Sequence, residues 1–398
     1  MLTSNRPGFA NTILPFIINS SAYLIIPYSR PVVLVIQALP ALAAKLLFPH
    51  IRHIVPYWFL PILFSFGWIA TAIVAYYTPP NVTSALRILT VVLASVISAA
   101  GDIFWLGLLR YYGKIGLQGW GMGTGSGMIV CAVMPYILTV VMGKFLRSGI
   151  TYAYYLVPVM LLAHWFVLPP APKPRNGEPG ARFKPDGHDG LDEEESASLI
   201  IQDSAALPVT MRQRFQSNIR LLSQLVSPFI LPLVLGSAGQ AMTYAGFSRA
   251  MASSPYFSRY TTYLAIYGFI FQSGNLIGRS SMIIARVHKT KVLIVAMVLG
   301  TCLVLLNAVF LFVSTPVIVF PLVFAIGTSV GLVYIETFAA AVEDKTFHSG
   351  ADREFALGTI GVGEPAGLWL GGLIGSLLES SLCGMQLGSG QRWCDTTT

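Results

Sequence analysis

Apolar residues fill long stretches of the chain, and polar residues gather in short connections between them. A helix that crosses a bilayer needs about 20 mostly apolar residues. The pattern therefore predicts an all-α integral membrane protein. Its eleven expected membrane helices cover residues 8–28, 32–49, 56–77, 84–109, 120–143, 150–169, 224–247, 260–279, 290–314, 316–341 and 355–378.

One long hydrophilic stretch, roughly residues 170–215, interrupts this pattern and is rich in Pro, Gly and charged residues. Such a composition cannot bury enough apolar surface to fold alone. The stretch that follows, "VTMRQRFQSNIRLLSQL", is basic and amphipathic, which indicates a segment at the membrane interface. We expect four regions: an N-terminal six-helix half at 1–169, a disordered linker at 170–223, a C-terminal five-helix half at 224–380 and a tail at 381–398.

The composition and the charge support a membrane protein. Hydrophobic residues make up 54 % of the 398 residues and charged ones 11 %, whereas soluble domains carry about 25 % charged residues. We assign the net charge of +8 to short loops that orient the helices, so the expected partner is the lipid bilayer and not nucleic acid.

The positions of Lys and Arg predict the orientation of the chain. They favour a cytosolic N-terminus and central linker, which places the C-terminus in the lumen. The same orientation places the glycosylation sequon at Asn81 on the luminal side. Cys383 and Cys394 follow the last predicted helix, where a disulfide could join them.

The linker holds an acidic dileucine pattern, Glu195 followed by Leu199 and Ile200. Sorting adaptors of the lysosomal or vacuolar route read this pattern. A chance match in an acidic segment is the alternative, so adaptor binding is an expectation of the sequence.

Three carboxylates fall inside predicted membrane helices, namely Asp102, Glu336 and Glu364. A charged side chain at the bilayer centre costs at least about 2.5 kcal/mol, so such residues usually face the interior of a bundle. Asp102 and Glu336 are expected near the cytosolic helix ends, with structural and functional roles both open. For Glu364, beside Pro365, we expect a broken helix and a side chain that faces a central cavity and binds a cationic group or a proton. The alternative is a protonated glutamate with one interhelical hydrogen bond.

Two further patterns allow two interpretations each. Gln272, Asn275 and Arg279 lie on one helix face, which indicates either a buried polar stripe or a substrate-facing one. The glycines of "GWGMGTGSGMIV", residues 119–130, are spaced like those of a dinucleotide-binding motif. No strand precedes them, so close helix packing is the preferred interpretation.

Several motifs resemble the battenin family of eukaryotic lysosomal and vacuolar membrane proteins. They are "SAAGDIFWLGLLRYY", "YGFIFQSGNLIGRSS", "VYIETF", "DREFALG" and "GEPAGLWLGGLIGSLLESSLC". The resemblance implies a fold like that of the major facilitators, in a vacuolar or lysosomal membrane. It also implies a link to pH homeostasis and to the handling of basic amino acids or glycerophosphodiesters. The chain departs from the family pattern at Gln37, Gln240, Glu336 and Glu364.

The expected function is that of a transporter, or a transport-linked regulator, of a small solute such as a cationic amino acid or a glycerophosphodiester. A non-transporting scaffold that regulates trafficking or a proton pump is the alternative. An enzyme is not expected, because no Ser/His/Asp set, histidine-rich metal site or Walker motif occurs, and no cofactor is expected. The residues expected to bind a substrate or a proton are Glu364, Glu336, Asp102, Gln240, Gln272, Asn275 and Arg279.

Overall fold

The computed structural model describes residues 12, 28–51, 59–77, 84–143, 220–252, 256–257, 259–283, 290–313, 315–344, 350–387 and 394. This part of the chain is helical and contains no β-strand. The predicted helices 8–28 and 150–169 fall almost wholly outside it, as do Asn81 and the dileucine residues Glu195, Leu199 and Ile200.

The N-terminal group of helices comprises α3 (Arg30–Ile51), α4 (Leu60–Tyr77) and α5 (Ser84–Tyr136), which continues into the π-helix η2 (Ile137–Val141). Two predicted helices are joined within α5. The expected loop at 110–119 is wrong, because a single non-helical residue, Gly113 (φ 54°, ψ −140°), separates them. Glycine adopts this backbone conformation at no steric cost. The chain therefore changes direction within one residue, and Leu117 and Trp120 after it are buried in helix.

The described part of the C-terminal group starts at Arg220, and residues 220–225 are helical. Leu225, in this stretch, is buried in the main core. The group consists of η5 (Val226–Ile230), α10 (Leu231–Ala241), η6 (Met242–Gly246), α11 (Tyr260–Ser280), η7 (Ser281–Ile283), α12 (Thr290–Phe310), α13 (Pro316–Glu343), α14 (Gly350–Ile360) and α15 (Gly363–Leu387).

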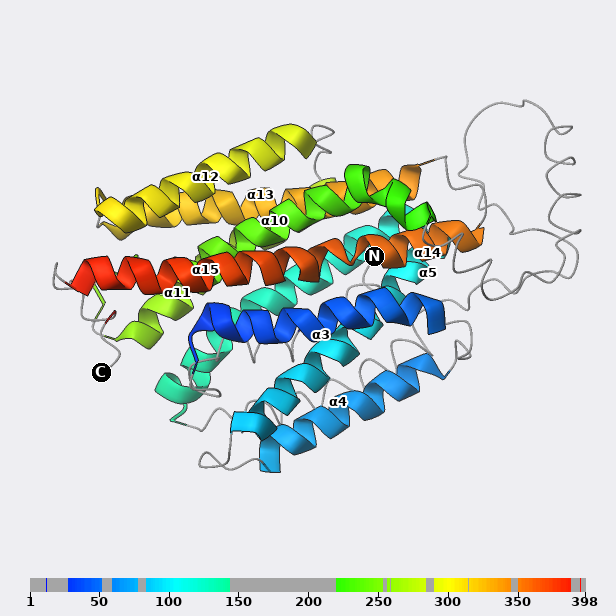
Figure 1. Ribbon diagram of the computed structural model, residues 1–398, viewed down its shortest axis with the longest axis horizontal. Coiled ribbons are helices and arrows are strands. Elements are labelled where there is room, and N and C mark those ends of the chain that lie inside the picture. The colour runs from blue at the N-terminus through cyan, green and yellow to red at the C-terminus, as the bar shows by residue number, and fades with distance from the viewer. Residues whose placement is uncertain are drawn as a thin grey trace, which may run out of the picture.

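The helices form one elongated bundle in which the N-terminal group lies along one side of the C-terminal group (Figure 1). Within the described residues, seven segments are long and apolar enough to cross a membrane. Large apolar side chains such as Phe66, Leu303 and Val317 point outward, as expected for a surface in contact with lipid. An all-α integral membrane protein is therefore confirmed.

The two groups meet through α3 and α5 on one side and α11, α13, α14 and α15 on the other. A buried apolar cluster crosses this boundary, with Phe104 and Trp120 of α5 in the same cluster as Tyr334 and Phe338 of α13. The charged side chains of the cavity described below come from these same helices.

Helices α11 and α13 approach each other more closely than ordinary side chains would allow. Gly274 and Gly278 of α11 face Gly327 and Gly331 of α13, and a Cβ at any of the four would meet backbone atoms of the other helix. Small residues four apart permit such contacts between membrane helices. Gly121, in the glycine run of α5, also permits a close helix contact. A Cβ on this residue would lie 2.8 Å from the Arg279 carbonyl oxygen, so close helix packing is the role of the glycine at this position.

The last predicted helix, 355–378, differs from expectation in its middle and at its C-terminal end. It is divided into α14 and α15 (Figure 1), and α15 reaches Leu387, so Cys383 lies on the helix and not in a tail that starts at 381. The serines near its end bond back to helix carbonyls, as Ser380 and Ser381 do to Leu377. This satisfies their hydroxyls without ending the helix.

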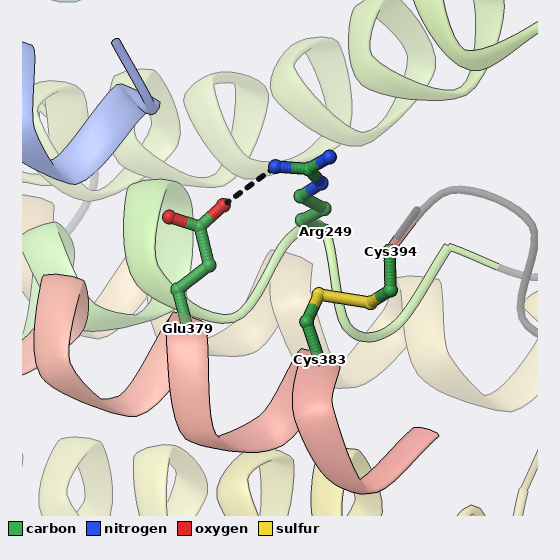
Figure 2. Close-up of a disulfide and its surroundings, with 4 residues drawn as sticks. All are labelled: Arg249, Glu379, Cys383 and Cys394. Atoms are coloured by element: carbon green, nitrogen blue, oxygen red, sulfur yellow. Dashed lines mark ion pairs between the residues drawn. A yellow bond between two sulfur atoms is a disulfide. The ribbon is translucent and has the colours of Figure 1, made fainter. Parts of the chain in front are cut away.

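Cys383 and Cys394 form a disulfide. Figure 2 shows it beside an ion pair in which Arg249 Nη1 lies 4.0 Å from Glu379 Oε1. Glu379 and Cys383 both belong to α15, and Arg249 follows η6. Both cysteines are buried. The bond therefore holds Cys394 against the last turns of α15.

Alkylation of the denatured protein will distinguish the bonded cysteines from the free ones. Cys131 and Cys302 are not disulfide-bonded, so intact mass spectrometry should detect two N-ethylmaleimide adducts without reductant and four after reduction. The two free cysteines are an internal control for complete labelling. Four adducts before reduction would contradict the disulfide.

Candidate functional site

A cavity of about 90 Å³ lies between the N-terminal and C-terminal groups of helices. Its walls contain small apolar residues, among them Ala38, Ala41 and Ala99, and a set of polar and charged side chains. One buried water needs about 10–15 Å³ of such space. The cavity can therefore hold several waters or part of a small solute.

Four charged side chains line this cavity and form a chain of ion pairs. Lys45 Nζ of α3 lies 2.8 Å from Asp102 Oδ2 of α5 and 3.4 Å from Glu364 Oε2 of α15. Glu364 Oε1 in turn lies 3.6 Å from Arg279 Nη2 of α11. Two cations and two carboxylates alternate, so their formal charges cancel.

The two cations are more deeply buried than the two carboxylates. The side chains of Lys45 and Arg279 are 3 % and 2 % exposed, whereas those of Asp102 and Glu364 are 19 % and 18 % exposed. A buried charge without a partner costs several kcal/mol. Each cation is therefore stable at this depth because carboxylates from other helices face it.

Arg279 is held by residues from three helices. Its Nε donates to Asn275 Oδ1 at 3.1 Å, and its Nη1 donates to Thr124 Oγ1 of α5 at 2.9 Å. The guanidinium lies over the ring of Tyr334 of α13, 3.8 Å from the centroid, and Trp120 Nε1 donates to the Tyr334 hydroxyl at 3.2 Å. These contacts fix the plane of the guanidinium at the cavity wall.

The break between α14 and α15 places Glu364 in the first turn of α15. Helix N-termini favour negative charge, so this position suits a carboxylate. The helix expected to be broken beside Glu364 and Pro365 is interrupted just before them, at Gly361 and Val362. Proline excludes the carbonyl four residues before it, here that of Gly361. The helix therefore ends one turn upstream, and Pro365 occupies the first turn of α15, where its missing N–H is tolerated.

The predicted polar stripe of α11 is buried. Asn275 Nδ2 donates to Gln272 Oε1 at 3.1 Å, so Gln272, Asn275 and Arg279 form a hydrogen-bonded row in which Arg279 lines the cavity. Gln240 lines a smaller neighbouring cavity of about 10 Å³, which Arg279 and Tyr334 also line. Glu336 is buried on α13 but does not line either cavity.

The structure brings the predicted site residue Asp102 to the cavity and adds Lys45, to which the sequence assigned no role. Asp102 lines the cavity, where the paired ammonium of Lys45 compensates its charge. Lys45 itself carries a signal that the sequence offers, since it is a lone cation inside a predicted membrane helix. Thr124 and Tyr334 carry no such signal, because their roles depend on where Arg279 lies.

This fold and this site define a class: a multi-pass, all-α integral membrane protein with a buried, charge-balanced cavity between two groups of helices. The chain belongs to the CLN3 protein family, which matches it over residues 7–385. The resemblance to the battenin family is thereby confirmed.

Fungal relatives cover nearly the whole chain. Protein BTN1 of Chaetomium globosum is 31 % identical over 97 % of this chain and 89 % of its own length. Protein btn-1 of Neurospora crassa is 28 % identical over the same shares of the two chains. Protein BTN1 of Yarrowia lipolytica is 28 % identical over 97 % of this chain and 95 % of its own.

Proposed function

We propose that this protein transports a small charged solute across a vacuolar or lysosomal membrane, without changing the solute covalently. The observation that carries the proposal is the cavity between the two groups of helices, lined by Lys45, Asp102, Arg279 and Glu364. Charged residues at membrane depth are costly and usually mark a substrate or ion pathway. Transporters place their solute sites near the midplane, between parts that move against each other.

Polar contacts between the two groups of helices support a rocking motion around this cavity. Lys45 and Glu364 join the groups at the cavity. Lys114 of α5 pairs with Glu343 of α13, at a site that is more exposed. If the groups rock, the exposed contact can open and close while the pair at the cavity rearranges around a solute.

The solutes to test are those that the family resemblance implies, basic amino acids and glycerophosphodiesters, in connection with vacuolar pH homeostasis. Purified protein in sealed vesicles should accumulate a labelled basic amino acid or glycerophosphodiester above empty vesicles, with a rate that depends on an imposed pH gradient. Ala41→Leu should reduce this uptake at least tenfold, because Ala41 lines the cavity and the larger side chain occupies its space.

Ala43→Leu is the matched control, because Ala43 lies on the same helix and is exposed. It should transport like the unaltered protein. A scaffold that regulates trafficking or a proton pump is the competing function. Absence of uptake of both solute classes, together with full activity of Ala41→Leu in cells, would favour the scaffold.

We assign the N-terminus and the central linker to the cytosol and the C-terminus to the lumen. The excess of Lys and Arg in the cytosolic segments supports this orientation. The disulfide at the C-terminal end agrees with it, because disulfides persist in oxidising compartments. Protease added to sealed vacuoles should cut within residues 170–215 and spare a C-terminal tag. Digestion of the tag in intact vacuoles would reverse the assignment.

Sorting through adaptor proteins gives a separate prediction. Leu199→Ala combined with Ile200→Ala should move a large share of the protein from the vacuolar membrane to the cell surface, because an adaptor groove loses two apolar side chains. Leu207→Ala with Val209→Ala, in the same linker, is the control and should leave the location unchanged. Microscopy at native expression measures both, and equal distributions would leave the dileucine pattern without a role.

A further inference from the structure

Three neighbours hold the guanidinium of Arg279 at the cavity wall. Asn275 and Thr124 accept hydrogen bonds from Nε and Nη1, at 3.1 and 2.9 Å, and the ring of Tyr334 covers one face. This leaves Nη2 directed toward Glu364. An arginine held in this way loses little side-chain entropy when an oxyanion binds, so it is a preorganised anion receptor.

Glu364 is the most loosely held member of the ion-pair chain. Its Oε1 lies 3.6 Å from Arg279 Nη2, which is longer than a hydrogen bond. Its Oε2 lies 3.4 Å from Lys45 Nζ, whereas the same ammonium lies 2.8 Å from Asp102. The carboxylate is thus attracted by two cations: it accepts a long hydrogen bond of 3.4 Å from Lys45, and Arg279 lies beyond hydrogen-bond distance.

Lys45 can keep Glu364 paired if another anion takes its place at Arg279. The ammonium already lies between Asp102 and Glu364, so a small movement of Glu364 toward Lys45 shortens an existing contact. No buried charge is then left without a partner, which avoids the several kcal/mol that an unpaired charge would cost. The exchange of one oxyanion for another is therefore energetically accessible.

We propose that Arg279 anchors the anionic group of the transported solute, and that the Glu364 carboxylate occupies this anchor until the solute displaces it. This inference rests on the proposed transport function and deepens it. The chemical class of the ligand is a solute with a singly charged oxyanion, either a carboxylate or a phosphodiester. Glu364 is in this sense an internal competitor of the solute, and the loosely held pair at 3.6 Å is the contact that the solute replaces.

Equilibrium binding to the purified full-length protein tests the anchor without measuring transport. The probes are lysine, its decarboxylated analogue 1,5-diaminopentane, glycerophosphoglycerol and glycerol. Glu364→Gln should bind lysine or glycerophosphoglycerol about tenfold more tightly than the unaltered protein, because the internal competitor has lost its charge. The two probes without an oxyanion should show no such gain, and whichever oxyanion probe gains identifies the carboxylate or the phosphodiester as the ligand.

Asp102→Asn is the matched control, because it removes one carboxylate from the same cavity but leaves the Glu364–Arg279 pair in place. It should tighten oxyanion binding much less than Glu364→Gln does. Equal gains in the two variants would overturn the proposal, since the net charge of the cavity would then explain both. Weaker binding in Glu364→Gln would also overturn it, because Glu364 would then hold a cationic group of the solute.

Two variants test the anchor itself. Arg279→Lys keeps the positive charge but loses the planar guanidinium with its several N–H donors, and it should weaken oxyanion binding at least tenfold. Thr124→Ala removes one acceptor that orients the guanidinium, and should weaken it severalfold even if Arg279→Lys does not fold. Unchanged binding in folded Thr124→Ala, or no binding of either oxyanion probe by the unaltered protein at millimolar concentration, would end the proposal.

The proposal of an anion anchor at Arg279 and the proposal of transport can be rejected independently of each other. Tightened binding in Glu364→Gln together with absent uptake in vesicles would keep the anchor and remove transport. Solute uptake together with equal effects of Glu364→Gln and Asp102→Asn would keep transport and remove the anchor.

Discussion

Lys45→Met should lower the free energy of unfolding by about 3–5 kcal/mol, the range found when one partner of a buried ion pair is removed. The ammonium of Lys45 lies 2.8 Å from Asp102 and 3.4 Å from Glu364. Without it, two carboxylates from different helices face one cavity and lose the cation that lies between them. Methionine retains most of the apolar part of the lysine side chain. The decrease in the free energy of unfolding therefore measures the loss of the charge and not a loss of packing. Thermal unfolding in detergent or nanodiscs measures it.

The double variant Lys45→Met with Asp102→Asn is the control for that experiment. Removing both charges of the closer pair should recover a large part of the lost stability, because the remaining Glu364 keeps Arg279 as its partner. Additive losses in the two single variants, with no recovery in the double variant, would show that Lys45 and Asp102 do not act as a pair.

Gly331→Ala should destabilise the protein by about 1–3 kcal/mol, the usual cost of an overpacked site. A Cβ on Gly331 would meet the carbonyl of Asn275, and it would lie 2.9 Å from the Arg279 amide nitrogen and 3.0 Å from Asn275 Oδ1. Backbone atoms cannot move aside as a flexible side chain can, so α11 and α13 must separate. Because Asn275 and Arg279 belong to the site, solute binding should weaken together with stability.

The matched control is Gly384→Ala in α15, where a Cβ would meet nothing within 4 Å. Alanine favours helix over glycine by about 1 kcal/mol, so this variant should be as stable as the unaltered protein or slightly more so. Equal melting temperatures for Gly331→Ala and Gly384→Ala would contradict the close contact between α11 and α13.

The fold class could be predicted from the sequence because lipid imposes a simple rule. Every spanning helix needs an apolar stretch of about 20 residues, and that rule identifies helices such as α12 and α13 from hydropathy. The same rule does not predict local changes in backbone conformation. The direction change at Gly113 and the break at Gly361 depend on conformations that a hydropathy pattern does not record.

From the sequence, a site residue could be predicted only where its residue type is rare in a membrane helix. Glu364 and Arg279 are charged residues in membrane helices, and the structure brings both to one cavity. The ion pair of Asp102 with Lys45 could not be predicted, because Lys45 lies 57 positions earlier in the chain and sequence position gives no distance between the two residues. Thr124 and Tyr334 are ordinary membrane-helix residues whose contacts with Arg279 exist only in the folded bundle.

The cancellation of charge in the cavity has an electrical consequence. Moving one elementary charge across a membrane potential of 100 mV involves about 2.3 kcal/mol. Lys45 and Arg279 formally balance Asp102 and Glu364, so the potential does no net work on this set when an empty cavity turns from one face of the membrane to the other. If the proposed transport function holds, voltage acts on the loaded form alone, through the charge of the solute, and the return of the empty carrier is electrically silent.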